Sequence, residues 1–478
     1  MKRNMRRLVV LMLILTLAFT SSIAYAGEAK EVKAPKYIFY FIGDGLGLSQ
    51  RQVGELFLQE ASNDKSKKLM MNTLPVTGLK TTYSSNTLVT DSAAAGTALA
   101  TGHKTDNGVI SKTPDGKDLK TILELAEEKG YATGLVSTTR ITHATPASFA
   151  SHNVNRDNEN EIAVDFLDSG VEFFAGGGYR HFAPKAWEFG KSKRKDERDL
   201  LKEFAGLGYN VFAGEKDSAN FLKFAPKGKE KVFAALSYSH LPYDIDRLST
   251  LDTPSLSQLT EKGIEVLSQY EDGFFMMVEG GRIDHAAHSN DPVGTIHDVL
   301  AFDDAIKKAY KFYEKNPADT LIIVAADHET GGLGLGMGLD YFLNLEELFD
   351  VKASTEAIGY EDKKYDGNRE EYFKYIEKVY SLENLTEKER AEIEKAMDLE
   401  DKGIEGSKRE YGYLTKEPTA IAVAHVISNR ANIYWTTFAH SGVPIPLTAV
   451  GVNAEDFSGY NDNTMIAKKL AKIIGGEL

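Results

Sequence analysis

The sequence of 478 residues contains no cysteine, which excludes disulfide bonds as a source of stability. Basic residues are in the minority, with 56 Lys and Arg against 70 Asp and Glu, and the formal net charge is −14. We therefore expect no nucleic-acid-binding surface, although bound metal cations would still allow an anionic substrate because they invert the local field. Beyond the first 26 residues, the sequence has no apolar run long enough to cross a membrane.

The first 26 residues have the pattern of a secretory signal peptide. Four basic residues precede an apolar run over 8–19, and an Ala-x-Ala cleavage site ends at Ala26. An uncleaved membrane anchor is the alternative, but the run is short for a full span. Cleavage after Ala26 would remove four positive charges and change the net charge from −14 to −18. We expect an exported protein, periplasmic or secreted, with no membrane attachment once residues 1–26 are removed.

Apolar runs that alternate with helical patterns predict the fold class. The runs typical of strands buried on both faces cover residues 37–42, 131–137, 274–278 and 321–326, and helical patterns cover 92–102 and 118–129. Such alternation predicts an α/β fold with a mostly parallel central sheet flanked by helices on both faces. We expect one α/β domain over 27–478, with a charged helical insertion at about 339–415 that has no buried-strand pattern.

The stretch over 90–102 places Ser92 beside Asp91 at the front of an Ala-rich run. Ala favours helix, so the run predicts a helix that begins near Ser92 and stops at Gly102. A hydroxyl there lies among backbone N–H groups that have no intrahelical partner, at the positive end of the helix dipole. Such a position suits an anion and an ionised nucleophile. Taken alone, an ordinary Ser/Asp N-cap is the commoner explanation.

Acidic and histidine residues gather at or just beyond the predicted strands: Asp44, Glu279, Asp284, His288, Asp327, His328 and His440. Asp284 and His288 are four residues apart, so one helical face could present both. Open α/β sheets bind ligands at the carboxyl ends of their strands. Carboxylates with imidazoles suit Zn²⁺, and carboxylates with hydroxyls suit Mg²⁺. Five other histidines have no comparable neighbours and are expected to be ordinary core or surface residues: His152, His181, His240, His297 and His425.

Taken together, these motifs resemble those of bacterial alkaline phosphatases, in the superfamily of metal-dependent phospho- and sulfohydrolases. The matching segments are 42–45, 90–94, 144–146, 278–280, 326–332 and 440–442. They extend over nearly all of the chain after residue 26, apart from the insertion. The resemblance implies hydrolysis of phosphate monoesters to alcohol and inorganic phosphate at alkaline pH, through a phosphoserine on Ser92. It also implies a homodimer.

The resemblance implies three metal ions in each chain, two Zn²⁺ and one Mg²⁺. One zinc would be held by Asp284, His288 and His440. The other zinc would be held by Asp44, Asp327 and His328, with Ser92 joining it in the free enzyme. The third ion would be held by Asp44, Thr145 and Glu279. Arg156 falls where the family keeps the arginine that clamps the phosphate.

Two positions depart from the pattern of many bacterial members. His143 stands where they have an aspartate near the third metal, and His285 stands where they have a lysine that reaches the phosphate through water. Imidazole is a softer ligand than a carboxylate. We therefore expect His143 to make the third site accept Zn²⁺ or Co²⁺ more readily than Mg²⁺.

Three other functions compete with a phosphomonoesterase. A phosphodiesterase of the same superfamily is the nearest, but Arg156 favours a monoester dianion because a guanidinium can hold two non-bridging oxygens. A sulfatase needs an oxidisable Cys or Ser in its own motif, and the chain has no cysteine. A non-enzymatic protein that binds metal or phosphate would have no use for a nucleophile at a helix N-terminus.

Overall fold

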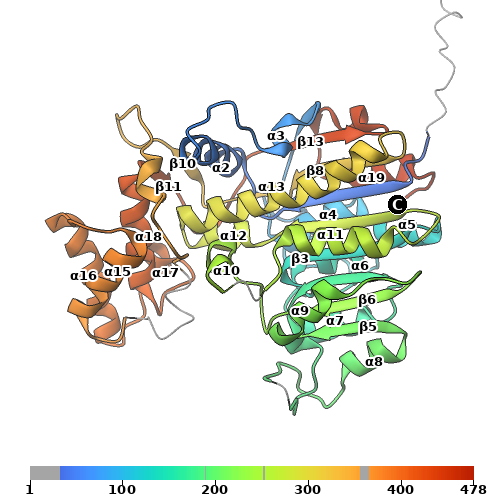
Figure 1. Cartoon of the computed structure of the whole chain (residues 1–478), viewed down its shortest axis with the longest axis horizontal. Coiled ribbons are helices and arrows are strands. Elements are labelled where there is room, and N and C mark those ends of the chain that lie inside the picture. The colour runs from blue at the N-terminus through green and yellow to red at the C-terminus, as the bar shows by residue number, and fades with distance from the viewer. Residues whose placement is uncertain (1–32, 189, 251–252, 356–364) are drawn as a thin grey trace, which may run out of the picture. The chain divides into compact units, whose positions relative to one another are not determined.

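A ten-stranded sheet forms the centre of the described chain in this computed structural model (Figure 1). The structure describes residues 33–188, 190–250, 253–355 and 365–478, so the predicted signal peptide over 1–26 lies outside the described residues. The described residues from Pro35 onward belong to one compact unit. Among them, no helix combines the length and the apolar character that a membrane span requires.

The sheet has the strand order β14-β2-β13-β8-β1-β7-β3-β4-β6-β5. Its strands are β1 (Tyr37–Gly43), β2 (Val76–Lys80), β3 (Ala132–Arg140), β4 (Phe173–Gly177), β5 (Tyr209–Ala213), β6 (Lys231–Ala235), β7 (Phe274–Gly280), β8 (Thr320–Ala326), β13 (Ile445–Gly451) and β14 (Gly459–Asn461). Within this sheet, β13 alone runs antiparallel to its neighbours, β8 and β2. The predicted mostly parallel sheet is confirmed.

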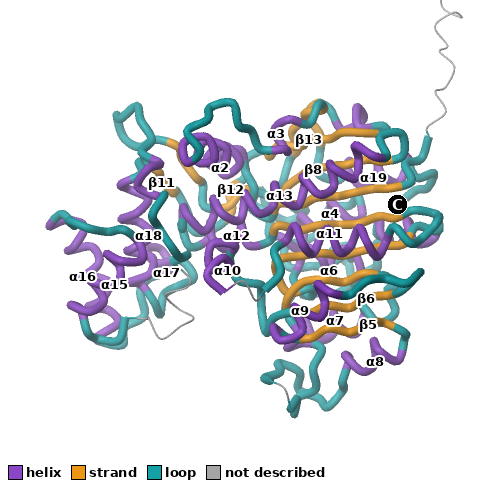
Figure 2. Tube along the Cα trace, in the orientation of Figure 1, coloured by secondary structure: helices purple, strands orange, loops and turns teal. Residues whose placement is uncertain are grey.

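Helices cover both faces of the sheet, as Figure 2 shows. The central strand β1 explains why, because Tyr40 packs into one hydrophobic cluster while Phe39 and Phe41 pack into another on the opposite face. The first cluster draws on α4 (Ser92–Thr101), α5 (Ile122–Glu128), α6 (Ala144–Ala150), α7 (Glu159–Asp165), α8 (Leu200–Gly206) and α19 (Met465–Ile473). The second draws on α3 (Met70–Thr73), α9 (Ser218–Lys223), α11 (Leu256–Leu267) and α13 (Pro292–Lys315).

The helix expected over 118–129 is shorter than predicted. Its first residues stay outside α5 because Thr121 forms a capping box with Glu124 and so begins the helix at Ile122. The helix expected near Ser92 has the predicted limits, since α4 covers Ser92–Thr101 and Gly102 ends it with φ of 70°. Only glycine adopts that conformation at little cost, which explains the stop.

Several helices of the segment 339–415 pack into a third hydrophobic cluster. They are α15 (Arg369–Tyr380), α16 (Glu387–Asp401) and α17 (Lys408–Tyr411), and α18 (Pro418–Arg430) follows them. The cluster also contains residues of α2 (Leu48–Ala61), α12 (Arg282–His288) and β11 (Ile433–Trp435). The described part of this segment thus has the predicted helical character, and its status as an insertion stays a prediction.

Candidate active site

Ser92 is the first residue of α4, and Asp91 is its N-cap. The Asp91 carboxylate accepts a hydrogen bond of 2.9 Å from Ala94 N, which satisfies one of the open donors of the first turn. The Ser92 side chain is 2% exposed, and its Oγ lies 3.3 Å from His328 Nε2. Because Asp91 and not Ser92 caps the helix, Ser92 Oγ remains available to the site.

Three carboxylates meet at one edge of the sheet. Asp44 follows β1, Asp327 follows β8, and Glu279 stands at the end of β7. The register places Gly43 opposite both Gly280 and Ala326, so the three strand ends are level. This is the arrangement that parallel strands with acidic ends predict.

Three histidines adjoin these carboxylates, and in each the Nδ1 atom is already engaged. His440 Nδ1 lies 2.7 Å from Thr90 O, His288 Nδ1 lies 2.5 Å from Phe438 O, and His328 Nδ1 lies 3.2 Å from Thr330 Oγ1. When Nδ1 donates to such an oxygen, Nε2 is left as the free lone pair that a metal requires. The outer contacts thus prepare all three rings as ligands.

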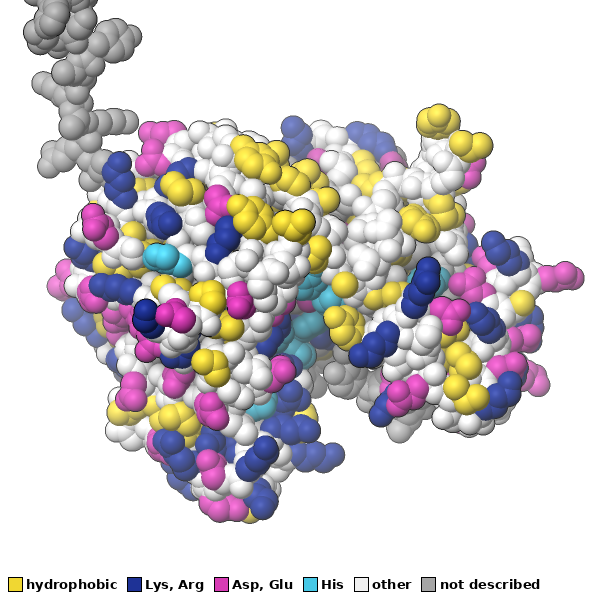
Figure 3. Space-filling model, turned by 180° about the vertical axis from the view of Figure 1, so that it is seen from behind, with side chains coloured by type: hydrophobic (Ala, Val, Ile, Leu, Met, Phe, Trp, Pro, Cys, Tyr) yellow, Lys and Arg dark blue, Asp and Glu magenta, His cyan; other side chains and the backbone are white. Residues whose placement is uncertain are grey.

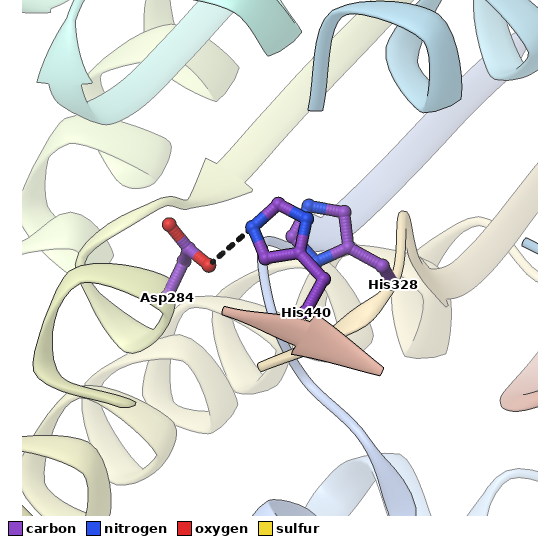
Figure 4. A group of neighbouring side chains, drawn as sticks. All are labelled: Asp284, His328 and His440. Atoms are coloured by element: carbon purple, nitrogen blue, oxygen red, sulfur yellow. Dashed lines mark ion pairs between the residues drawn. The ribbon is translucent and has the colours of Figure 1, made fainter. Parts of the chain in front are cut away.

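The Nε2 atoms of these rings point into one space. The rings of His328 and His440 stack with centroids 3.5 Å apart (Figure 4). His440 Nε2 also lies 3.1 Å from His288 Nε2. Asp284 binds to this group, with its carboxylate 3.3 Å from His288 Nε2 and 3.5 Å from His440 Nε2. Asp284 and His288 share one face of α12, as their spacing predicts.

Potential ligand atoms form three groups whose members lie within 4.8 Å of one another. They are Asp284, His328 and His440; Asp44, Asp327 and His328; and Asp44, His143 and Glu279. The second group coincides with the protein side chains expected around the second zinc, apart from Ser92. The first group contains His328 where the expected set has His288. The third group joins His143 to Asp44 and Glu279, two of the side chains expected around the third ion.

Several buried polar atoms of the site have no hydrogen-bond partner among the described residues. They are both carboxylate oxygens of Asp44, Asp327 Oδ2, Glu279 Oε1, Thr145 Oγ1 and His143 Nδ1. A buried polar atom without a partner costs free energy, and a buried charge costs more. A set of such oxygens and nitrogens is the donor set that divalent cations bind, so these residues fit metal ions.

The raised pKa values of three buried carboxylates show that their ionised forms are unfavourable without nearby positive charge. Burial raises the pKa of Asp44 well above its usual value, that of Asp327 to about 6 and that of Glu279 to about 7. Burial also acts on Asp284, but the neighbouring His288 and other histidines outweigh it and hold its pKa well below the usual range. Bound cations would reverse the rise at the first three residues.

Arg156 stands at the other side of Ser92. Its Nη1 donates to Asp91 Oδ2 at 3.0 Å, and its Nη2 lies 3.2 Å from His143 Nε2. Ser92, Asp284 and Arg156 all line one cavity of about 540 Å³. In the space-filling view, histidine side chains lie in a recess of the surface (Figure 3).

The two histidines that depart from the bacterial pattern lie in this cavity with a third. The rings of His143 and His285 have centroids 5.4 Å apart, and those of His240 and His285 are 4.3 Å apart. His240 lines the cavity as well, so the prediction that it is an ordinary core or surface residue is wrong. Its position depends on the loop after β6, which no local pattern predicts.

Two further residues of the site, Asp91 and Tyr413, could not be assigned to it from the sequence. Asp91 was interpreted only as part of a cap, although it also anchors Arg156. Tyr413 lies in the segment expected to be a solvated insertion, yet its ring centroid is 4.9 Å from that of His288. Its neighbours in the sequence carry no motif that would have identified it.

A family model of alkaline phosphatases matches residues 35–475. The chain belongs to the alkaline phosphatase family. It is 34% identical over 493 aligned residues to alkaline phosphatase 3 of Bacillus subtilis, and the alignment covers 99% of this chain and 98% of that one. The alkaline phosphatase is therefore a metal-dependent enzyme that hydrolyses phosphate monoesters, and the phosphodiesterase alternative is not supported.

Solved structures of alkaline phosphatases share the fold of this enzyme. That of Thermus thermophilus superposes with a TM-score of 0.80 at 28% identity, covering 95% of this chain and 96% of that chain. A histidine-to-aspartate variant of the alkaline phosphatase from the Antarctic bacterium TAB5, with Mg bound in its M3 site, has a TM-score of 0.64 at 28% identity. That comparison covers 94% of this chain and 100% of the other.

Proposed function

We propose that this phosphatase works through a phosphoserine on Ser92. The observation that carries the proposal is the position of its buried Oγ at the N-terminus of α4, 3.3 Å from His328 Nε2. Ser92 Oγ loses its proton to the alkaline solvent and forms a bond to phosphorus, while the bond from phosphorus to the ester oxygen breaks and that oxygen takes a proton from water, so the alcohol leaves. A water molecule then attacks the phosphorus of the phosphoserine. The bond from phosphorus to Ser92 Oγ breaks, Oγ takes up a proton, and inorganic phosphate is released.

Arg156 holds the phosphoryl group during both steps. Its guanidinium has the planar fork that binds two non-bridging oxygens. The ion pair with Asp91 fixes this fork next to the start of α4, where open backbone N–H groups also face an anion. The two features orient the phosphorus toward Ser92 Oγ and favour a dianionic monoester over a diester.

Two Zn²⁺ and a third ion, Mg²⁺ or a softer ion, would complete the site. The expected zinc ligands are Asp284, His288 and His440 for one ion and Asp44, Asp327, His328 and Ser92 for the other. Asp44, Thr145 and Glu279 would hold the third ion. When bound, these ions supply positive charge that stabilises the attacking and leaving oxygens of an in-line displacement. The unpartnered oxygens of Asp44, Asp327 and Glu279 support this assignment.

His143 and His285 would modulate the third metal and the phosphate. His143 Nδ1 has no hydrogen-bond partner among the described residues, and His143 groups with Asp44 and Glu279. A nitrogen donor at this place favours Zn²⁺ or Co²⁺ over Mg²⁺. The TAB5 variant with aspartate in place of a histidine has Mg bound in its M3 site.

The phosphoserine is tested by covalent labelling. Enzyme loaded with zinc and magnesium is mixed with inorganic phosphate or a monoester, quenched in acid and examined by intact mass spectrometry. We expect Ser92→Ala to lose the phosphate adduct and nearly all turnover while it keeps its metal content. Ser85→Ala, which changes an exposed serine of the preceding loop, serves as the matched control. Full phosphorylation of Ser92→Ala would refute the assignment.

The finer biological setting is also a proposal. The basic, apolar and Ala-x-Ala pattern of residues 1–26 supports export and cleavage after Ala26, which N-terminal sequencing of the mature enzyme would test. The family supports a homodimer, which light scattering would test. The family supports small phosphate monoesters as partners, and the acidic net charge argues against a nucleic acid. Residues 339–415 would be an insertion on the α/β domain over 27–478.

A further inference from the structure

A second and larger cavity, of about 810 Å³, adjoins the cavity of Ser92. It lies between α16, α17, α18 and the segment 433–439. Its lining combines aromatic side chains with charges of both signs, from Lys395, Lys408 and Arg409 and from Glu392 and Glu410. The residues that matter here are Tyr413, Tyr434, Trp435, Phe438, Lys408 and Arg409. Tyr413 lines both cavities, so the two meet at its ring.

A series of contacts leads from the nucleophile to this ring. Ser92 Oγ lies 3.3 Å from His328, the His328 ring stacks on His440 at 3.5 Å, and His440 lies 3.1 Å from His288. The ring of His288 in turn lies 4.9 Å from that of Tyr413. The last contact of this series reaches the larger cavity, because Tyr413 also lines it.

The geometry of phosphoryl transfer indicates on which side of the phosphorus the alcohol leaves. In an in-line displacement, the attacking and leaving oxygens lie on opposite sides of the phosphorus. With Ser92 on one side and Arg156 gripping the non-bridging oxygens, the alcohol leaves on the side away from Ser92. The series of histidines places that side toward Tyr413.

We propose that the larger cavity is the subsite for the alcohol portion of the substrate, and that it selects monoesters whose alcohol carries an aromatic ring system of nucleoside size. The proposal rests on the proposed role of Ser92, and it deepens that role by naming a substrate class. Tyr413 is the residue that determines this specificity, because it stands where the two cavities join.

The surface of the cavity fits such a group. Tyr413 is 70% exposed and Tyr434 is 48% exposed, so their rings offer free faces for stacking. Trp435 is only 8% exposed, and its Nε1 donates to Ser428 Oγ at 3.0 Å, which makes it a fixed wall. The volume of about 810 Å³ falls within the range of small-molecule sites. The exposed side chains of Lys408 and Arg409 add positive charge near the π-systems and favour an electron-rich ring.

The test compares two substrates that share the phosphate ester and differ in the alcohol, adenosine 5′-monophosphate and glycerol 3-phosphate. Base-on-aromatic stacking is strong enough that Tyr413→Ala should lower the ratio of their kcat/KM values by about tenfold, mainly through the KM of the nucleotide. Tyr413→Phe should retain the ratio, since it keeps the ring. Tyr341→Ala removes a fully exposed tyrosine outside both cavities and is the matched control.

The outcomes separate stacking on the alcohol portion from an effect on the reaction itself. An equal loss on both substrates leaves the ratio unchanged, so it would mean that Tyr413 acts through His288 and would overturn the proposal. No loss on either substrate would overturn it as well. Phenyl phosphate, examined alongside, shows whether a single ring is sufficient or the nucleoside is required. The turnover of Ser92→Ala tests the proposed phosphoserine. The ratio of kcat/KM values in Tyr413→Ala tests the proposed subsite, so the two proposals can fail independently.

A binding measurement on the full enzyme tests the proposed subsite without turnover. The sequence has two tryptophans, and Trp187→Phe leaves Trp435 as the only one. Adenosine, which has no phosphate, should change the Trp435 fluorescence in a saturable way at millimolar concentration. Tyr413→Ala in the same background should weaken that response. Absence of a saturable response to adenosine would contradict the subsite even if the phosphoserine were proved.

Discussion

Arg156 and Asp91 form a hydrogen-bonded ion pair, with Arg156 Nη1 3.0 Å from Asp91 Oδ2. The same carboxylate accepts hydrogen bonds from Ala94 N at 2.9 Å and from Gly108 N at 3.0 Å. One side chain thus caps the helix that begins with Ser92 and also anchors the arginine beside it. A single residue therefore sets the spacing between Ser92, the proposed nucleophile, and Arg156, the proposed phosphate clamp.

The two roles of Asp91 can be separated by two substitutions. Asp91→Ala removes the cap and should lower the free energy of unfolding by about 1 kcal/mol, whereas asparagine is itself a good N-cap and should cost much less. Both variants lose the charge that anchors Arg156, so both should raise the inhibition constant of inorganic phosphate. Urea unfolding and product inhibition are the measurements. Equal destabilisation by the two variants would show that the cap is not what Asp91 contributes.

The guanidinium fork of Arg156 should matter more than its charge. Arg156→Ala removes charge-assisted hydrogen bonds to the phosphoryl oxygens and should lower kcat/KM for a monoester by about 10- to 100-fold. Arg156→Lys restores the charge without the fork and should recover only part of the loss. Steady-state kinetics with Arg198→Ala, an exposed arginine paired with Glu203, provides the control. Full activity in Arg156→Lys would argue against a bidentate clamp.

Removal of metal should reveal the cost of the buried carboxylates. A chelator should abolish activity and lower the thermal midpoint, because bound ions stabilise the folded state by mass action. Asp327→Asn should have a lower thermal midpoint than the wild type when metal is bound, because the variant lacks one ligand. Without metal its midpoint should be higher than that of the wild type, because one buried charge fewer is left uncompensated.

That reversal is measured by thermal unfolding of four samples, each protein with and without chelator. The Asn side chain can still accept from Gly45 N and His328 N, as Asp327 Oδ1 does at 3.1 Å and 2.9 Å, so the loop is preserved. A difference of about 1 °C in each direction is expected for a change of about 1 kcal/mol in a chain of this size. The same rank in both conditions would show that cations do not compensate this cluster.

The third metal site should change its preference when His143 is replaced. His143→Asp exchanges a nitrogen donor for a hard carboxylate, so Mg²⁺ should activate the variant more strongly than the wild type. Metal content after equilibration with equal concentrations of Zn²⁺, Co²⁺ and Mg²⁺ gives a readout that does not depend on turnover. If preference and Mg²⁺ activation are both unchanged, His143 is not a ligand of that site.

A pair of glutamates far from the active site should make stability fall as the pH rises. Burial, with the nearby carboxylate of Glu172, raises the pKa of Glu127 from its usual 4.5 to about 7 in the folded chain. Below pH 4.5 both the folded and the unfolded chain hold this proton, so the group has no effect there. Between pH 4.5 and 7 the unfolded chain releases its proton first, and stability is lost up to the folded pKa.

Glu127→Gln should therefore raise the free energy of unfolding above pH 7 and have no effect below pH 4.5. A gain of about 1 kcal/mol is expected after allowance for solvent screening of a partly exposed group. Denaturant unfolding at several pH values measures it. Glu128→Gln alters the exposed neighbour and should be neutral at every pH. A gain that is constant across the pH range would exclude the proposed titration.

Much of the framework follows from local patterns in the sequence. Continuous apolar runs such as that of β1 can be buried on both faces only in a covered parallel sheet. The Ala-rich run after Asp91 forms a helix and Gly102 ends it, because propensity and positive φ act within a few residues. Acidic residues placed just after such runs must come to the carboxyl edge of the sheet, which is why Asp44 and Asp327 could be assigned to one site.

Only the tertiary structure decided which side chains meet. Three contacts show this: Arg156 pairs with Asp91 across 65 positions of the sequence, the ring of His240 lies beside that of His143 across 97, and Tyr413 lies beside His288 across 125. Such contacts depend on strand register, on loop paths and on how the helices of a charged segment pack. These are properties of the whole fold, because each depends on the free energy of many contacts at once and none leaves a periodic signal in the chain.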